Sequence, residues 1–239
     1  MAGSSMPGVS AMKPHEFRAA RLAKGWTQTQ AAARLGMTQA YLNFLEHVKR
    51  RLTPELVRRA TSVYELSPDV LPLANPFTPA QTDDQRLTEF LSMLGYPGFS
   101  YLRTHTPKKH PYEVLLSALA QQTLEGRVAE ALPWVVLKYA QPNSWLVENA
   151  RKFNLQNRLG FVVTLARRLS ELRNLNDRST ELNKLENLLD DSRLAKEDVF
   201  YRPPRTESER EWLRSNRTED AVHWNLLADM KPEHLQYGD

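Results

Sequence analysis

Two short helices joined by a very tight turn are predicted between Gly25 and Glu46, and this stretch constrains the fold more than any other. Thr27 can accept a hydrogen bond from a free N–H at the start of the first helix. Apolar side chains then recur at the three- and four-residue spacing of one buried helical face, at Ala31, Ala32 and Leu35. Gly36 ends that helix, and Thr38 can cap the next one. A turn this short is typical of the helix-turn-helix that places its second helix in the major groove of DNA.

The second of these helices carries a small, amide-rich outer surface. Leu42 and Leu45 are expected to face inward, which leaves five side chains on the outside: Thr38, Gln39, Ala40, Asn43 and Phe44. Asn and Gln amides can pair with adenine through two hydrogen bonds, and small apolar groups can pack on the thymine methyl. A helix face that only meets solvent more often carries Glu and Lys. We therefore expect these five residues to contact base edges. The alternative is an ordinary three-helix packing unit with a glycine in a turn.

Residues 12–72 as a whole resemble the XRE family, the Cro and CI repressor-like helix-turn-helix proteins. The similarity is carried by FRAARLAKGWTQ, AAARLGMTQAYLNFLE and LSPDVL. It implies a five-helix domain whose third helix, about Thr38 to His47, enters the major groove, with Gln28 on a phosphate and Gln39 on base edges. The chain departs from the family pattern at Val48, where the family commonly has Gly. There either the third helix runs on or the loop differs.

The remaining DNA contacts are expected on phosphates. Thr27 and Tyr41 are assigned to this role, and so are three consecutive cations after the reading helix, Lys49, Arg50 and Arg51. Residues 1–75 hold 10 Lys and Arg against 5 Asp and Glu, whereas the rest of the chain holds 22 against 23. Cations that directly follow a recognition helix would meet the DNA backbone and make binding depend on salt. A solvated surface is the alternative for such a basic run.

The composition is that of an ordinary globular protein. Of 239 residues, 41% are hydrophobic and 25% are charged, and no apolar run approaches the ~18 residues that a membrane helix requires. There is no cysteine, which excludes disulfides, a thiol nucleophile and cysteine-ligated metal sites. The first residues lack the basic start and apolar core of a secretory signal. We expect a cytoplasmic protein with a flexible tail at residues 1–12, and translation could start at Met1, Met6 or Met12.

Four prolines within thirteen residues, SPDVLPLANPFTP, indicate a domain boundary, because proline and the residue before it disfavour helix. We predict a DNA-binding domain at 13–72, a proline-rich connector at 73–82 and a second domain at 83–239. The fold class is all-α throughout, and the second domain is expected to be an irregular helical bundle or a stack of helical hairpins. Its expected helices cover residues 83–94, 111–125, 125–139, 144–153, 155–172, 179–195 and 206–214. Pro133 is expected to kink or divide one of them.

The second domain also contains polar and aromatic groups that could form a site. His105 and His110 flank a basic turn in which Lys108 and Lys109 could contact a phosphate, while a metal there would need carboxylates from elsewhere. Plain surface is preferred for this turn. Two polar clusters form either a buried hydrogen-bonded network, which is preferred, or a partner-facing groove: Gln121, Gln122 and Thr123, with Gln156, Asn157 and Arg158. Four tryptophans are expected in the core rather than at an interface: Trp134, Trp145, Trp212 and Trp224.

No glycine loop for phosphates, nucleophile elbow or paired-histidine metalloprotease motif is present, so we expect no enzymatic activity, no catalytic residue, no metal and no cofactor. The function expected is a DNA-binding transcriptional repressor that binds double-stranded DNA as a homodimer, since one short domain reads only a few base pairs. The resemblance also points to an antitoxin that represses its own operon and holds a toxin. In the alternative, the helical domain clasps a partner protein and DNA binding serves only autoregulation. An enzyme of unfamiliar type in residues 80–239 is a third possibility.

Overall fold

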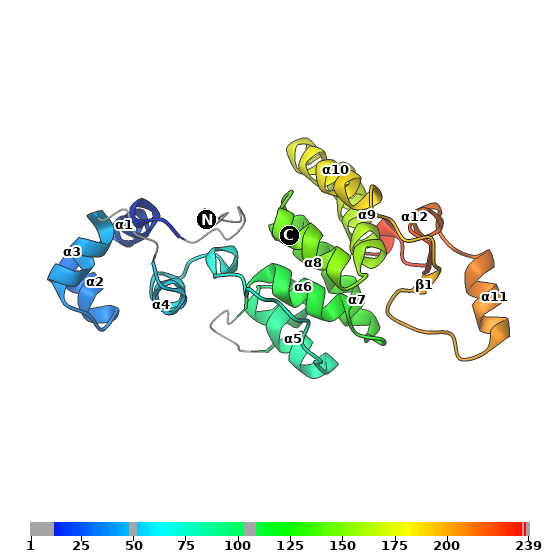
Figure 1. Cartoon of the computed structure of the whole chain (residues 1–239), viewed down its shortest axis with the longest axis horizontal. Helices are drawn as coiled ribbons and strands as arrows, with labels where there is room; N and C mark the ends of the chain where they lie inside the picture. The colour runs from blue at the N-terminus through cyan, green and yellow to red at the C-terminus, as the bar shows by residue number, and fades with distance from the viewer. Residues whose placement is uncertain (1–11, 48–51, 103–108, 236, 238–239) are drawn as a thin grey trace, which may run out of the picture. The chain divides into compact units, whose positions relative to one another are not determined.

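The computed structural model describes residues 12–47, 52–102, 109–235 and 237, and these residues form two compact units (Figure 1). The units divide between Pro76 and Phe77, and residues 109 and 110 belong with the smaller, N-terminal unit. The division lies inside the proline-rich stretch. On the larger unit, Phe77 packs its ring against Trp145 and Phe153, with ring centroids 5.1 and 5.9 Å away. The second half of the expected connector is therefore anchored to the larger unit.

The regular secondary structure in the described residues of the smaller unit is entirely helical. It consists of α1 (Pro14–Ala23), α2 (Gln28–Arg34), α3 (Gln39–His47), α4 (Pro54–Tyr64) and η1 (Pro68–Val70). The fifth of the expected helices is thus a single 3-10 turn. Phe17, Leu35, Leu42 and Tyr64 lie at the centre of one apolar core. Met12 is also buried in this core, so the folded unit includes a residue that was expected to belong to the tail.

The larger unit is an irregular bundle built around one central helix, α9 (Gln156–Leu172). Twelve of its 17 residues are buried, and it packs mainly against α10 (Asn176–Asp190) and α7 (Gly126–Tyr139). The remaining elements are α5 (Asp84–Met93), η2 (Pro97–Phe99), α6 (Pro111–Leu119), α8 (Ser144–Lys152), α11 (Glu207–Ser215), α12 (Glu219–His223) and η3 (Pro232–His234). In the described part of the chain, no helix is both long and apolar enough to cross a membrane.

Four features of the larger unit differ from the sequence prediction, and the first is that the helix expected at 111–125 already ends at Leu119. Pro133 does not divide its helix. Instead, α7 runs unbroken past it, and the proline ring is part of the apolar face that the helix buries. The helix expected at 179–195 begins earlier, at Asn176, and ends at Asp190. Two short strands that were not predicted, β1 (Asp198–Val199) and β2 (Leu226–Leu227), pair in parallel.

The segment after α12 is locked onto α9 by Trp224. Its indole ring is fully buried, and its Nε1 donates a hydrogen bond of 2.8 Å to Thr164 Oγ1. The ring lies over Gly160, where an added Cβ would come within 2.3 Å of ring carbons. Glycine at this position therefore provides the space into which the tryptophan packs.

The predicted polar network of the larger unit is confirmed for four of its six members. Arg158 joins the two clusters, because it donates to the carbonyls of Leu119 and Gln121 and forms a bidentate ion pair with Asp198. Asn157 pairs with both the N–H and the carbonyl of Leu194. The other two network residues are Gln121 and Gln156, whose amides donate to main-chain carbonyls. Gln122 and Thr123 are exposed instead.

The expectation that all four tryptophans lie in the core is wrong for one of them. Trp134, Trp145 and Trp224 are buried, but Trp212 is 57% exposed. It lies on α11, a helix without a single buried residue. The helix is amphipathic in sequence, and the unit covers its apolar face only in part, because Leu213 is half-buried whereas Trp212 is exposed.

Candidate nucleic-acid interface

Side-chain caps begin both α2 and α3, and one glycine lies in the turn between the two helices. Thr27 Oγ1 accepts from the N–H of Gln30, and Gln30 Oε1 accepts from the N–H of Thr27, which closes a capping box at the start of α2. Gly36 has a φ of +63°, the left-handed conformation that glycine adopts without strain. Thr38 Oγ1 then accepts from the N–H of Tyr41 at 3.2 Å and caps α3. The predicted helix-turn-helix is confirmed here.

A buried ion pair ties α3 to α1. Arg21 donates from Nε to Glu46 Oε1 at 2.6 Å and from Nη2 to Glu46 Oε2 at 2.9 Å, and its Nη1 donates to the carbonyl of Trp26 at 2.8 Å. The Glu46 side chain is inaccessible to solvent and that of Arg21 is 8% exposed. Because the two charges meet in a bidentate geometry, this pair fixes the orientation of α3 against the rest of the unit.

The electrostatics of the pair favour the charged state of both groups. Burial by itself would raise the pKa of Glu46, but hydrogen bonds from Arg21 and Gln28 and the Arg21 charge outweigh it, so the pKa of this carboxyl is lowered. The hydrogen bond to Glu46 raises the pKa of Arg21 further. Nearby, burial raises the pKa of the Tyr64 hydroxyl to about 12.

A chain of amide hydrogen bonds extends from Glu46 to the outer surface. Gln28 Nε2 donates to Glu46 Oε2 at 2.9 Å and to Asn43 Oδ1 at 3.1 Å, while Gln39 Nε2 donates to Gln28 Oε1 at 2.8 Å. Both amide hydrogens of Gln28 are thus used inside the unit, so a phosphate contact from this side chain requires one of these bonds to open. Gln39 and Asn43 are held in place and each still has a donor and an acceptor to offer.

The outer face of α3 is exposed as the sequence predicts. Leu42 and Glu46 are fully buried and Leu45 is partly buried. The exposed residues are Thr38, Gln39, Ala40, Tyr41, Asn43, Phe44 and His47. The structure therefore brings the five expected base-reading residues together on one surface, with the expected phosphate residues Thr27 and Gln28 at the start of the neighbouring helix α2.

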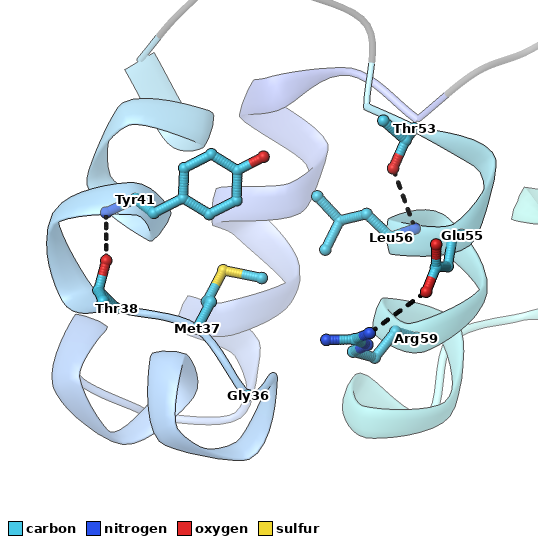
Figure 2. A pocket seen from close by; sticks show the side chains of 8 residues that line it. All are labelled: Gly36, Met37, Thr38, Tyr41, Thr53, Glu55, Leu56 and Arg59. Atoms are coloured by element: carbon cyan, nitrogen blue, oxygen red, sulfur yellow. Dashed lines mark hydrogen bonds and ion pairs between the residues drawn. The ribbon is translucent and has the colours of Figure 1, made fainter.

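A cavity of about 460 Å³ lies beside this surface, between the turn, α3 and α4 (Figure 2). Its walls include Met37, Tyr41 and Leu56, with Arg59 at one side. Arg59 donates to the carbonyl of Leu35 at 2.9 Å and pairs with Glu55 at 3.4 Å. The polar groups that line the cavity therefore largely pair with one another. Because the cavity lies between the Tyr41 ring and α4, side chains of α4 do not cover this side of the ring.

Several candidates from the sequence are placed differently or not at all. Lys49, Arg50 and Arg51, together with Val48, lie outside the described residues, as do His105 and Lys108. His110 is buried rather than on the surface, and burial lowers its pKa to about 4 despite the charge of Asp69. Among the described residues, no group of three or more His, Cys, Asp or Glu side chains could hold a metal ion.

Sequence reasoning missed the Arg21–Glu46 pair. A signal was present, because Glu46 follows Leu42 by four residues on the inward stripe of α3, and Arg21 follows Phe17 in the same way on α1. Charged residues on an apolar stripe are typical of a buried pair. The two residues are 25 positions apart in the sequence, so no local pattern reveals that they are partners.

Comparison with known proteins identifies the smaller unit. Residues 17–71 match the model of the helix-turn-helix family, and the matched span runs from within α1 to the residue after η1. No significant match was found among curated proteins or among solved structures.

Proposed function

We propose that this chain, whose residues 17–71 belong to the XRE-type helix-turn-helix family, is a sequence-specific transcription regulator that reads the major groove with α3. One observation carries the proposal: the exposed face of α3 holds Gln39 and Asn43 in a fixed amide network and keeps their remaining donors and acceptors free. Side-chain amides held in this way suit the N6 and N7 edge of adenine. Binding is proposed to be the entire chemistry of the protein.

Selection of binding sites from a random duplex library tests this function. The full chain should enrich one sequence motif, and Gln39→Ala should weaken binding to it by about 1–3 kcal/mol and relax the preference at one base position. Gln122→Ala is the matched control, because Gln122 is an exposed glutamine of the larger unit. Enrichment of no motif, or equal effects of the two substitutions, would contradict the proposal.

Repression by a homodimer is the form of regulation we propose. A single domain of this size reads only a few base pairs, so two copies on half-sites about one helical turn apart are needed for useful specificity. The larger unit is the proposed dimerisation element, since it offers large exposed apolar side chains such as Trp212 and Leu172. A transcription assay with the selected site placed at a promoter distinguishes repression from activation.

The antitoxin role is a narrower version of the same proposal. Here the larger unit would hold a partner protein, and the smaller unit would repress the operon that encodes both. Its support is the same set of exposed apolar side chains, which also fits a protein partner. Copurification of one stoichiometric partner that is encoded beside this gene would support this role. A lone gene beside a metabolic operon would favour a ligand-responsive regulator.

A further inference from the structure

Two aromatic side chains stand on the exposed face of α3. Tyr41 is 49% exposed and Phe44 is 48% exposed, and their rings stack with centroids 6.5 Å apart and planes 14° from parallel. They lie three residues apart, so they form one continuous strip along the helix. The amides of Gln39 and Asn43, four residues apart, form a second exposed strip, and Ala40 and His47 lie between the two strips.

The exposure of this pair contrasts with the other rings of the smaller unit. Phe17 and Tyr64 are almost completely buried, and Trp26 packs against Tyr64 and is covered by the Arg34 guanidinium at 4.2 Å from its ring centroid. Tyr41 and Phe44 instead stack on each other, and the Tyr41 ring projects from α3 towards α4 over the cavity (Figure 2). Because the stacked rings are about half exposed, they give α3 an apolar surface that faces outward.

The major groove offers one apolar group to such a surface, the C5 methyl of thymine. Because the stacked aromatic pair and the amides of Gln39 and Asn43 are all exposed on α3, we infer that Phe44 packs on thymine methyl groups and that Tyr41 holds the Phe44 ring in position. Together with the recognition of adenine by Gln39, these contacts make the centre of each half-site rich in A·T base pairs. The inference rests on the proposed function and specifies the bases that α3 selects.

Replacement of single thymines by uracil in the selected site tests the inference directly, because uracil lacks only the C5 methyl. Affinities are measured for the unaltered full chain, so protein folding does not complicate the result. At one or two thymines of each half-site, uracil should weaken binding about fourfold, the effect of one buried methyl group. Uracil elsewhere in the site should have no effect.

Substitutions then assign the effect to the aromatic pair. Phe44→Ala should bind thymine and uracil sites equally, and Tyr41→Ala should reduce the discrimination, whereas Tyr41→Phe should keep it because the ring remains. Tyr101→Ala is the control for loss of an exposed aromatic side chain, because Tyr101 is 65% exposed on the larger unit, and it should keep the full discrimination. Circular dichroism checks that each variant is folded.

The possible outcomes separate this inference from the function on which it rests. A selected site that is indifferent to uracil at every thymine would overturn the inference alone, and so would uracil discrimination that persists in Phe44→Ala. A change of oligomeric state in the Tyr41 and Phe44 variants, with DNA affinity unchanged, would make the pair a protein contact and overturn it too. Absence of any selected motif would overturn both the proposed function and the inference.

Discussion

The buried carboxylate of Glu46 helps to orient the exposed side chains of α3. It lies on the inner side of α3, while Gln28 and Asn43 connect it to the outer side through hydrogen bonds. An apolar residue would fill the same space but would leave the Arg21 guanidinium without its carboxylate partner and the Gln28 amide without one acceptor. The ion pair therefore contributes orientation to the interface in addition to any contribution to stability.

Removal of one partner of this pair should strongly destabilise the smaller unit. We expect Glu46→Ala to lower the free energy of unfolding by about 3–5 kcal/mol, because Arg21 would stay buried without its counter-charge. Hydrogen exchange of the buried α4 amides measures this unit separately from the larger one. Glu65→Ala is the control: its pair with Lys24 has the same 2.6 Å separation but a Glu65 side chain that is 79% exposed. The control should cost far less, because solvent screens an exposed pair, and equal losses for the two variants would contradict the account.

The lowered pKa of Glu46 gives the same unit a defined acid sensitivity. Because the folded-state pKa lies below the unfolded value of about 4.3, the carboxylate stabilises the fold above that pH. This stabilisation should be lost as the pH falls through the folded-state pKa. Unfolding measured as a function of pH should show the loss in the unaltered chain but not in Glu46→Gln. Identical acid profiles for the two proteins would refute this role.

His110 should make a separate contribution at milder pH. Its folded-state pKa of about 4 lies below the unfolded value of about 6.5, so the unfolded chain binds the additional proton between these values. Stability should therefore fall by up to about 3 kcal/mol as the pH decreases from 6.5 to 4. His110→Phe should remove this dependence, which a series of urea unfolding curves can measure. If the free energy of unfolding depends on pH in His110→Phe as it does in the unaltered chain, another group is responsible for the dependence.

At the scale of elements, the contact between Trp224 and α9 holds the last segment of the larger unit in place. Gly160→Ala would place a methyl group where the indole ring lies, and overpacking of this kind costs about 1–3 kcal/mol. We expect a lower melting temperature and a red-shifted tryptophan emission as Trp224 becomes exposed. Gly126→Ala is the matched control, because a Cβ at that helical position meets no atom within 4 Å. Equal melting temperatures for the two variants would argue against the packing role.

Sequence patterns predicted the starts of several helices because a capping side chain marks each of these starts. Asp83, Asn143 and Thr206 cap α5, α8 and α11 at or beside the expected starts. The pairing of β1 with β2 could not be predicted, since each strand has only two residues and the partners lie far apart in sequence. The continuity of α7 through Pro133 likewise depends on burial against neighbouring helices, which outweighs the lost hydrogen bond.

The candidate site was predictable on its exposed side and not on its buried side. Gln39, Asn43 and Phe44 follow from helical periodicity alone, which assigns the outer face of α3. The use of Gln28 as an internal bridge depends on tertiary contacts between α2 and α3. Trp212 was wrongly predicted to be buried. The general preference of large apolar residues for the core does not show whether the fold provides a surface against which a given side chain can pack.

At the scale of the whole molecule, the positive charge is concentrated in the N-terminal part, while the rest of the chain is almost neutral. This division fits a protein in which one unit approaches the DNA phosphates and the other assembles the complex. We predict that two chains bind each complete operator, as mass photometry of the complex can measure. A single chain bound with full affinity and specificity would contradict the dimer.

The central claim is that α3 reads base edges in the major groove, and 7-deazaadenine tests it most directly. This base lacks the N7 acceptor of the major-groove edge, whereas 3-deazaadenine lacks the N3 acceptor of the minor-groove edge. At the adenine contacted by Gln39, we predict that 7-deazaadenine weakens binding about tenfold and that 3-deazaadenine has no effect. Gln39→Ala should be insensitive to both. Full affinity for 7-deazaadenine at every adenine of the operator, with loss of affinity on 3-deazaadenine, would contradict the account.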